Sequence, residues 1–239
     1  TIKYNKQIIG TLAAVWKEIE IKYKKYNGIY FADLKLHNNY RKKGIINTLF
    51  WYLLFRWPFN KNFKQWDFAY YCAMLRSGKG VEKSFNIFNP ANLATPSALL
   101  NIYMIDPNKI ASINSKSDYY KNNNYGINLS PIREEMVFWN DGIKDIISKK
   151  DKTIIPLGHL HPQFFNNVYS VKHKNAIDEI CNKKGALACF GIDRRQKQII
   201  QWLDSHNIST QTKCKIFSFS PFAPSLRNIN SLYISTGEI

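Results

Sequence analysis

Apolar and polar positions alternate along much of the first half of the chain, and this pattern predicts paired strands. Residues 2–15 have the pattern of a hairpin, with Asn5-Lys6 as its turn. Residues 16–23 alternate apolar and charged side chains, as a half-exposed strand does. The turn signal Asn27-Gly28 precedes a further short apolar run at residues 29–36. The first forty residues are therefore expected to form a hairpin followed by further strands.

A different pattern follows this sheet. From Ile45 the chain is apolar on nearly every face up to Pro58, and the run is too long for an ordinary strand. We therefore predict a buried helix that ends before the proline. Residues 66–74 form another apolar run, which we interpret as a buried strand. The expected order is hairpin, strand, helix, strand.

The second half is expected to be richer in helices. Residues 99–105 are apolar and lie between two prolines, so they fit either a strand or a short helix. Ser130-Pro131 followed by acidic residues is typical of a helix start, and we predict a helix running from there toward Ile147. Helices are also predicted near residues 178–181 and 194–203, and strand-like alternation appears at residues 216–224.

The most informative stretch joins the third predicted strand to the first predicted helix. There the turn Arg41-Lys42-Lys43-Gly44 lies at the start of the helix. A helix N-terminus presents unpaired backbone N–H groups and the positive end of the helix dipole, which together favour a bound anion. Glycine lets the main chain approach a phosphate closely. The alternative is an ordinary solvated basic helix start, because a lone Arg-x-x-Gly has low specificity.

This stretch, Asp33-Leu34-Lys35-Leu36-His37-Asn38-Asn39-Tyr40-Arg41-Lys42-Lys43-Gly44-Ile45-Ile46, resembles the signature of the GNAT acyl-CoA N-acyltransferases. Asn38 stands where the family usually has proline, and Ile46 where it usually has a small residue. The order of elements over roughly residues 1–90 is also the family's, although the strand and helical region that usually open the fold are not recognisable.

The resemblance implies a fold and a co-substrate. The expected fold is α+β, a GNAT-like mixed central sheet flanked by helices, with residues 1–120 as the acyl-CoA-binding core and residues 121–239 as a helix-rich C-terminal extension. Acetyl-CoA or another acyl-CoA would be the co-substrate. The pantetheine arm would lie along Leu34, Lys35 and Leu36, and the pyrophosphate would be held by Arg41, Lys42, Lys43, Gly44, Ile45 and Ile46.

The reaction implied is transfer of an acyl group, most simply acetyl, to a primary amine of a small molecule, a protein lysine or a protein N-terminus. An uncharged amine attacks the thioester, so the site must align both groups, remove a proton and stabilise an oxyanion. Asp33 and His37 are the candidate bases, with Glu18 and Glu20 on the preceding strand. Tyr70 and Tyr71 are the candidate acids for the leaving thiolate. Each of these side chains also fits a solvated or core position.

The net charge of +17 favours association with polyanions, which could be nucleic acid, an anionic membrane surface, an acidic protein or a phosphate-rich cofactor. The alternative function is therefore a non-catalytic basic module that binds RNA, DNA or an anionic surface, in which Tyr23-Lys24-Lys25-Tyr26 and Tyr119-Tyr120-Lys121 would provide stacking and phosphate contacts. The positive charge also has an explanation that involves no partner, because the abundance of Lys, Asn and Ile matches an AT-rich coding bias.

Several other classes of protein are disfavoured. The chain has no apolar stretch of about 18 residues, and its start lacks the layout of a signal peptide. The four cysteines are widely spaced and form no Cys-x-x-Cys pair, so a reducing, cytoplasmic location is expected. His159 and His161 share a spacing that some metal sites use, but no third ligand is identifiable, and no metal is expected.

Overall fold

The computed structural model describes residues 1–56, 65–75, 93–114, 126–130, 136–139, 145–148, 151–161, 164 and 171–239. The chain divides into two compact units. Unit 1 comprises residues 1–97 and 215–228, and unit 2 comprises residues 98–214 and 229–239. Two strands, β5 (Thr95–Ile105) and β12 (Thr212–Phe219), each begin in one unit and end in the other.

Unit 1 is built on a sheet that begins with a long antiparallel hairpin. Its strands lie in the order β1-β2-β3-β4-β12, where β1 is Ile2–Tyr4, β2 is Gln7–Ile21, β3 is Lys24–Leu36 and β4 is Phe68–Leu75. The predicted turn at Asn5-Lys6 is confirmed, and both residues have positive φ, as a two-residue hairpin turn requires. Residues 7–21 form one continuous strand rather than the two that were predicted.

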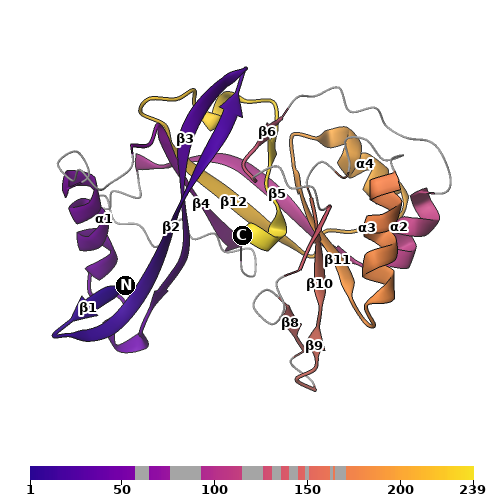
Figure 1. Ribbon diagram of the computed structural model, residues 1–239, viewed down its shortest axis with the longest axis horizontal. Coiled ribbons are helices and arrows are strands. Elements are labelled where there is room, and N and C mark those ends of the chain that lie inside the picture. Colours follow the sequence, from indigo (N-terminus) through magenta and orange to yellow (C-terminus); the bar gives the residue numbers. More distant parts are fainter. Residues whose placement is uncertain are drawn as a thin grey trace. The chain divides into compact units, whose positions relative to one another are not determined.

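The helix after β3 is also confirmed, but the prediction that it is buried is wrong, because none of its described side chains is buried and Tyr52 and Phe55 are largely exposed. Helix α1 (Ile45–Arg56) ends before Pro58, as predicted, and the 3₁₀ helix Asn38–Tyr40 precedes it. The Phe50 ring of α1 meets the Phe31 ring of β3 edge-on, with 5.9 Å between their centres. Helix α1 therefore covers the face of the sheet that carries Phe31, and Figure 1 shows it beside β1, β2 and β3.

The register between β3 and β4 is fixed at the start of their paired region. The N–H of Asn27 donates to the Asp67 carboxylate at 2.7 Å, and the N–H of Asp67 donates to the Asn27 carbonyl at 2.7 Å. Gly28 then lies directly beneath the Phe68 ring, where a Cβ would come within 2.6 Å of a ring carbon. These contacts set a parallel pairing that runs from Gly28 beside Phe68 to Phe31 beside Tyr71.

Unit 2 has its own sheet and core. Its strands follow the order β5-β11-β10-β7, with β11 at Leu187–Asp193, β10 at Leu157–Leu160 and β7 at Val137–Phe138. Three helices, α2 (Pro107–Asn114), α3 (Val171–Asn182) and α4 (Lys197–Ser205), supply Ile110, Ile180 and Leu203 to the core that they share with Phe190 of β11. Figure 1 shows these helices gathered beside β11.

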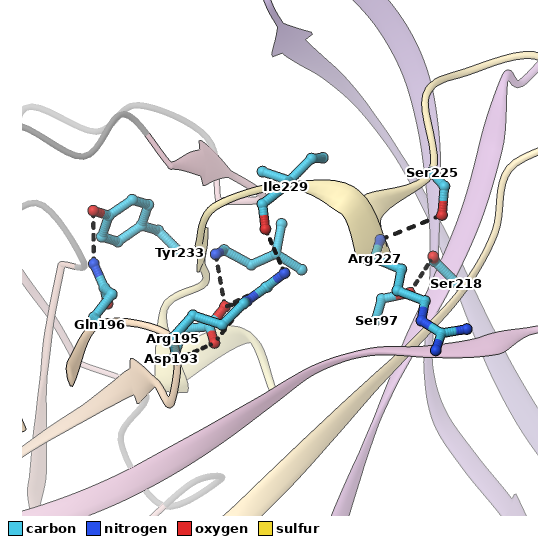
Figure 2. A network of polar contacts seen from close by, with 10 residues as sticks. Ser97, Asp193, Arg195, Gln196, Ser218, Ser225, Arg227, Ile229 and Tyr233 are labelled. Atoms are coloured by element: carbon cyan, nitrogen blue, oxygen red, sulfur yellow. Dashed lines mark hydrogen bonds and ion pairs between the residues drawn. The ribbon is translucent and has the colours of Figure 1, made fainter.

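A buried polar network holds residues 229–233 against β11 in unit 2. The Asp193 side chain, which is 1% exposed, pairs with the Arg195 guanidinium and accepts the N–H of Leu232 at 2.8 Å. Arg195 also donates to the Ile229 carbonyl at 2.6 Å. Figure 2 shows Arg195 between these two partners, and Gln196 donating to the Tyr233 hydroxyl at 2.7 Å. Strand β13 (Leu232–Tyr233) in turn pairs with β6 (Ile127–Asn128).

Two predictions for the second half are wrong. Residues 130–147 do not form one helix, because Val137–Phe138 pairs with β10 and β8 (Ile146–Ile147) pairs with β9 (Ile154–Ile155). The helix-rich extension is likewise not found, because the described part of residues 121–239 holds only α3 and α4 among several strands. The predicted helices at 178–181 and 194–203 correspond to α3 and α4, and residues 99–105 lie in strand β5.

The predicted division at residue 120 does not coincide with the compact units, whose boundaries lie within β5 and β12. The division at residue 120 separates two predicted roles, a cofactor-binding core before it and an extension after it. These two roles stay predictions. None of the helices in the described part of the chain is long and apolar enough to cross a membrane.

Candidate functional site

The candidate site in unit 1 lies where β3 stops pairing with β4. The last pair joins Phe31 to Tyr71, although β3 continues to Leu36 and β4 to Leu75. Beyond Phe31, β3 has no partner strand on its β4 side among the described residues. An unpaired strand edge can hydrogen-bond an extended ligand as if it were an added strand. This edge is the segment predicted to hold a pantetheine arm.

A β-bulge lies at the point where the pairing ends. Thr11 pairs with Lys35 and Ala13 with Ala32, so Asp33 and Leu34 together oppose the single residue Leu12. Asp33 has a φ of +50°, in the left-handed region that few non-glycine residues occupy. The Thr11 hydroxyl donates to the Asp33 carbonyl at 3.5 Å. Bulges recur beside active sites because they redirect the chain and expose backbone groups.

The turn between β3 and α1 has the features of an anion-binding loop. Lys42 and Gly44 have φ values of +62° and +72°, and Arg41 to Gly44 are all exposed. Thr48 donates its N–H to the Gly44 carbonyl at 3.0 Å, which closes the first turn of the helix. The N–H groups of Ile45, Ile46 and Asn47 have no acceptor among the described residues. Unpaired N–H groups of this kind attract anions, and the helix dipole adds to the effect.

Two of the three cations of this turn are held in place. The Arg41 Nε donates to the Leu36 carbonyl at 2.9 Å, which ties the turn to the end of β3. The Lys43 ammonium lies 5.5 Å from the centre of the Tyr40 ring. Of the residues predicted to hold a pyrophosphate, Arg41, Lys42 and Lys43 are cationic and exposed, whereas Ile45 and Ile46 are half-buried at the start of α1.

The candidate bases lie in different surroundings. Asp33 is exposed and sits in the bulge itself, next to the end of the β3–β4 pairing. His37 caps the 3₁₀ helix instead, because its Nδ1 accepts the N–H of Asn39 at 3.4 Å and its ring packs on Tyr40. Glu18 is paired with Lys25 at 2.7 Å in the β2–β3 hairpin. Of these carboxylates, Asp33 is the one closest along the chain to the strand opening.

Tyr70 and Tyr71 point to opposite faces of the sheet, as neighbours in a strand must. Tyr70 is 1% exposed and lies between the Tyr30 and Phe68 rings, with ring centres at 5.0 and 5.9 Å. Tyr71 stacks on Phe217 at 5.0 Å and pairs with Phe31, on the face that α1 covers. Burial raises the pKa of Tyr71 to about 12, so the phenol keeps its proton at neutral pH. Because their side chains lie on opposite faces of the sheet, Tyr70 and Tyr71 cannot both act in the same site.

Sequence reasoning missed two hydroxyl residues of this site. Thr11 donates to the backbone of the bulge, and the Thr48 hydroxyl donates to the Gly44 carbonyl at 3.3 Å. A threonine four residues after a helix-start glycine is a recognisable signal for the second contact. The bulge has no such signal, because an aspartate in a strand does not by itself predict a positive φ.

The two histidines of the Gly-His-Leu-His-Pro segment lie in the core of unit 2. His159 is 2% exposed, and its Nδ1 lies 2.9 Å from the Thr236 hydroxyl, which donates to the Cys189 carbonyl at 3.2 Å. His161 is 5% exposed and follows β10. Cys189 is buried as well, and burial raises the pKa of its thiol to about 11. The predicted Tyr119-Tyr120-Lys121 segment lies outside the described residues.

Comparison with known proteins rests on structure alone. No family model matches the sequence, and no curated protein matches it. Among solved structures, a Saccharomyces cerevisiae N-myristoyltransferase with bound myristoyl-CoA and inhibitors is similar to 95% of this chain over 71% of its own length. The TM-score is 0.50 and the sequence identity is 10%. Two other structures of the yeast enzyme with bound myristoyl-CoA match 92% and 90% of this chain.

Those two matches cover 65% and 67% of their own chains, with TM-scores of 0.39 and 0.40 and identities of 12% and 13%. N-myristoyltransferases have the fold of the GNAT superfamily. The architecture of this chain, mostly sheet with four α-helices in the described part, therefore resembles a GNAT fold. At this identity the similarity concerns the fold.

Proposed function

We propose that this protein is an acyl-CoA-dependent N-acyltransferase that transfers an acyl group from CoA to a primary amine. The observation that carries the proposal is the arrangement at the end of β3. There a bulged strand, whose edge beyond Phe31 has no partner strand in the described part of the chain, leads into an exposed cationic turn, and the first N–H groups of α1 have no acceptor in that same part. The strand edge would take the pantetheine arm and the turn the pyrophosphate, as the resemblance to GNAT enzymes implies.

The proposed catalytic roles follow from these positions. Asp33 would accept the proton of the attacking amine, with or without an intervening water, because it is exposed beside the strand opening. Backbone N–H groups of the bulge would stabilise the oxyanion that forms on the thioester carbonyl. Tyr71 would return a proton to the departing thiolate, because it lies at the last residue pair that joins β3 to β4 and its phenol is protonated at neutral pH. We place His37 at the start of the phosphate loop rather than in catalysis, since its ring caps a 3₁₀ helix.

The length of the acyl chain is a separate question. Acetyl-CoA is the simplest donor that the resemblance to GNAT enzymes implies. The yeast enzymes with the similar fold carry myristoyl-CoA, which favours including a long acyl chain among the donors tested. The acceptor amine is left open between a small molecule and a protein.

The proposal is tested by ligand-dependent stabilisation and by turnover. A ligand that binds only the folded chain raises its free energy of unfolding by about 2.7 kcal/mol at a hundred times its Kd. CoA, acetyl-CoA and myristoyl-CoA should therefore each raise the melting temperature, and the thioester that matches the acyl pocket should raise it most. Release of free CoA thiol in the presence of a panel of amines should then identify the acceptor class. A melting temperature unchanged by all three ligands would refute the proposal.

A further inference from the structure

Helix α1 has two faces of different character. Phe50 points toward the sheet, where its ring meets Phe31. At 3.6 residues per turn, Trp51, Tyr52 and Phe55 fall within one arc on the opposite side of the helix. This outward face, defined by those three residues, turns away from the core of unit 1.

The outward face is exposed although it is aromatic. The exposed fractions are 36% for Trp51, 56% for Tyr52 and 66% for Phe55. Trp51 and Phe55 stack with 5.5 Å between their ring centres, and the Arg56 guanidinium lies 5.5 Å above the Tyr52 ring. Single exposed apolar residues are common on protein surfaces, but a contiguous aromatic patch on one helix face marks an interaction surface.

The charge around this helix has one sign. Between Asp33 and Asp67 the sequence contains no acidic residue, whereas the average acid content of the chain would place about two there. The cations of the same stretch are Lys35, Arg41, Lys42, Lys43, Arg56, Lys61 and Lys64. In the described part, Arg41, Lys42, Lys43 and Arg56 lie at the two ends of α1, with the aromatic face between them, and Lys35 lies in β3. A partner for this surface must accept aromatic rings and carry negative charge.

We propose that the outward face of α1 docks on the surface of a bilayer that contains anionic phospholipids. Trp, Tyr and Phe side chains enter the headgroup and upper acyl region, while flanking Lys and Arg residues contact anionic headgroups. A helix of 12 residues is about 18 Å long, so it lies on the bilayer rather than spanning it. A nucleic acid fits less well, because its phosphates need cations interleaved with the stacking rings. Here Arg41, Lys42 and Lys43 precede the helix and Arg56 ends it, so these cations flank the rings along the chain rather than alternate with them.

Membrane docking is independent of the proposed enzymatic activity, because none of the three residues belongs to the β3 edge or to the phosphate-binding turn. A bilayer surface would nonetheless place the turn at the start of α1 close to the phase into which long-chain acyl-CoA partitions. The two proposals can fail separately, since one predicts CoA binding and the other vesicle binding.

Sedimentation with sucrose-loaded vesicles tests the docking proposal. The full chain should sediment with phosphatidylcholine vesicles that contain phosphatidylserine, and much less with vesicles of phosphatidylcholine alone. The double variant Tyr52→Ser/Phe55→Ser should lower the partition constant about tenfold or more, because it removes two rings from the bilayer. Both side chains are exposed, so the variant should keep its melting temperature and its response to CoA.

The matched control is Tyr23→Ser. Tyr23 is 94% exposed and flanked by lysines at the tip of the β2–β3 hairpin, so it is an equally accessible aromatic residue in a basic setting. This variant should bind vesicles within about twofold of the natural chain, because the lipid contact lies on α1. The proposal is overturned if the double variant binds vesicles normally, or if Tyr23→Ser loses as much. It is also overturned if the double variant instead dissociates a dimer or releases a bound oligonucleotide.

Discussion

At the scale of single residues, the proposed chemistry depends on where Asp33 and Tyr71 are held. Asp33 lies in a β-bulge with left-handed backbone, and Tyr71 lies one strand away at the last pair that joins β3 to β4. Neither position follows from residue type. A strained backbone conformation of this kind persists only where the surrounding structure fixes it, and such residues cluster at functional sites.

The role of Tyr71 can be tested by removing its hydroxyl. If Tyr71 protonates the departing thiolate, Tyr71→Phe should lower kcat by about 10² or more and leave the affinity for the acyl-CoA unchanged. Tyr103→Phe is a suitable control, because burial raises the pKa of Tyr103 too, and Tyr103 belongs to unit 2. An unchanged kcat in Tyr71→Phe would assign the proton to another group.

The raised pKa of the Tyr71 hydroxyl also predicts how the stability of the folded chain changes at alkaline pH. The pKa of Tyr71 is about 12 in the folded chain and about 10 in the unfolded chain, so the folded chain binds this proton more tightly. This contribution to stability is complete below pH 10 and is lost as the pH rises toward 12. Between pH 8 and pH 11 the unfolding free energy of the natural chain should fall by about 1 kcal/mol more than that of Tyr71→Phe. Urea unfolding of both proteins at pH 8 and pH 11 measures the difference, and a constant difference would contradict it.

At the scale of elements, the sequence predicted the local pieces better than their partners. The hairpin turn at Asn5-Lys6, the extent of α1 and strand β4 follow from turn residues and apolar runs, and the structure has all three. The helix predicted from Ser130 fails because strand pairing with β10 outweighs the local helix-start signal. The exposed cationic turn before α1 could be predicted, since its glycine and cations are contiguous, and its role in holding phosphate stays a prediction. The bulge could not, because it arises from the register between β2 and β3.

Residues 229–233 are held by a contact with a residue far away in the sequence, which the sequence alone does not predict. Residues 229–233 are anchored by the Asp193 carboxylate, which is buried and paired with Arg195. Asp193→Ala removes the acceptor of the Leu232 N–H and of the part-buried Arg195 guanidinium, so it should cost roughly 2 to 3 kcal/mol of unfolding free energy. The measurement is urea denaturation.

A neutral buried hydrogen bond provides the comparison for that change. Ser97 and Ser218, both in unit 1, share a hydrogen bond of 2.6 Å between their hydroxyls, also drawn in Figure 2. Ser97→Ala should cost only about 1 kcal/mol, because no charge is left behind. Equal costs for the two substitutions would mean that the Asp193 network does not carry the stability assigned to it.

At the scale of the whole molecule, the fold and the net charge bear on different properties of the protein. The similarity to N-myristoyltransferase structures concerns the fold, whereas the excess of positive charge speaks to anionic partners in general. The proposed CoA-binding turn lies in unit 1. The two compact units also offer an internal control, because each contains a Lys-Lys-Gly turn whose glycine has left-handed backbone.

The most direct test compares those two glycines. Gly44 has a φ of +72° and Gly185 a φ of +73°, and a Cβ added at either position would have no other atom within 4 Å. Gly44→Ala and Gly185→Ala should therefore each cost about 1 to 2 kcal/mol of stability through backbone strain alone. By calorimetric titration with CoA, Gly44→Ala should weaken binding at least tenfold, whereas Gly185→Ala should bind as the natural chain does. Equal affinity in both variants would show that the turn before α1 does not hold the pyrophosphate.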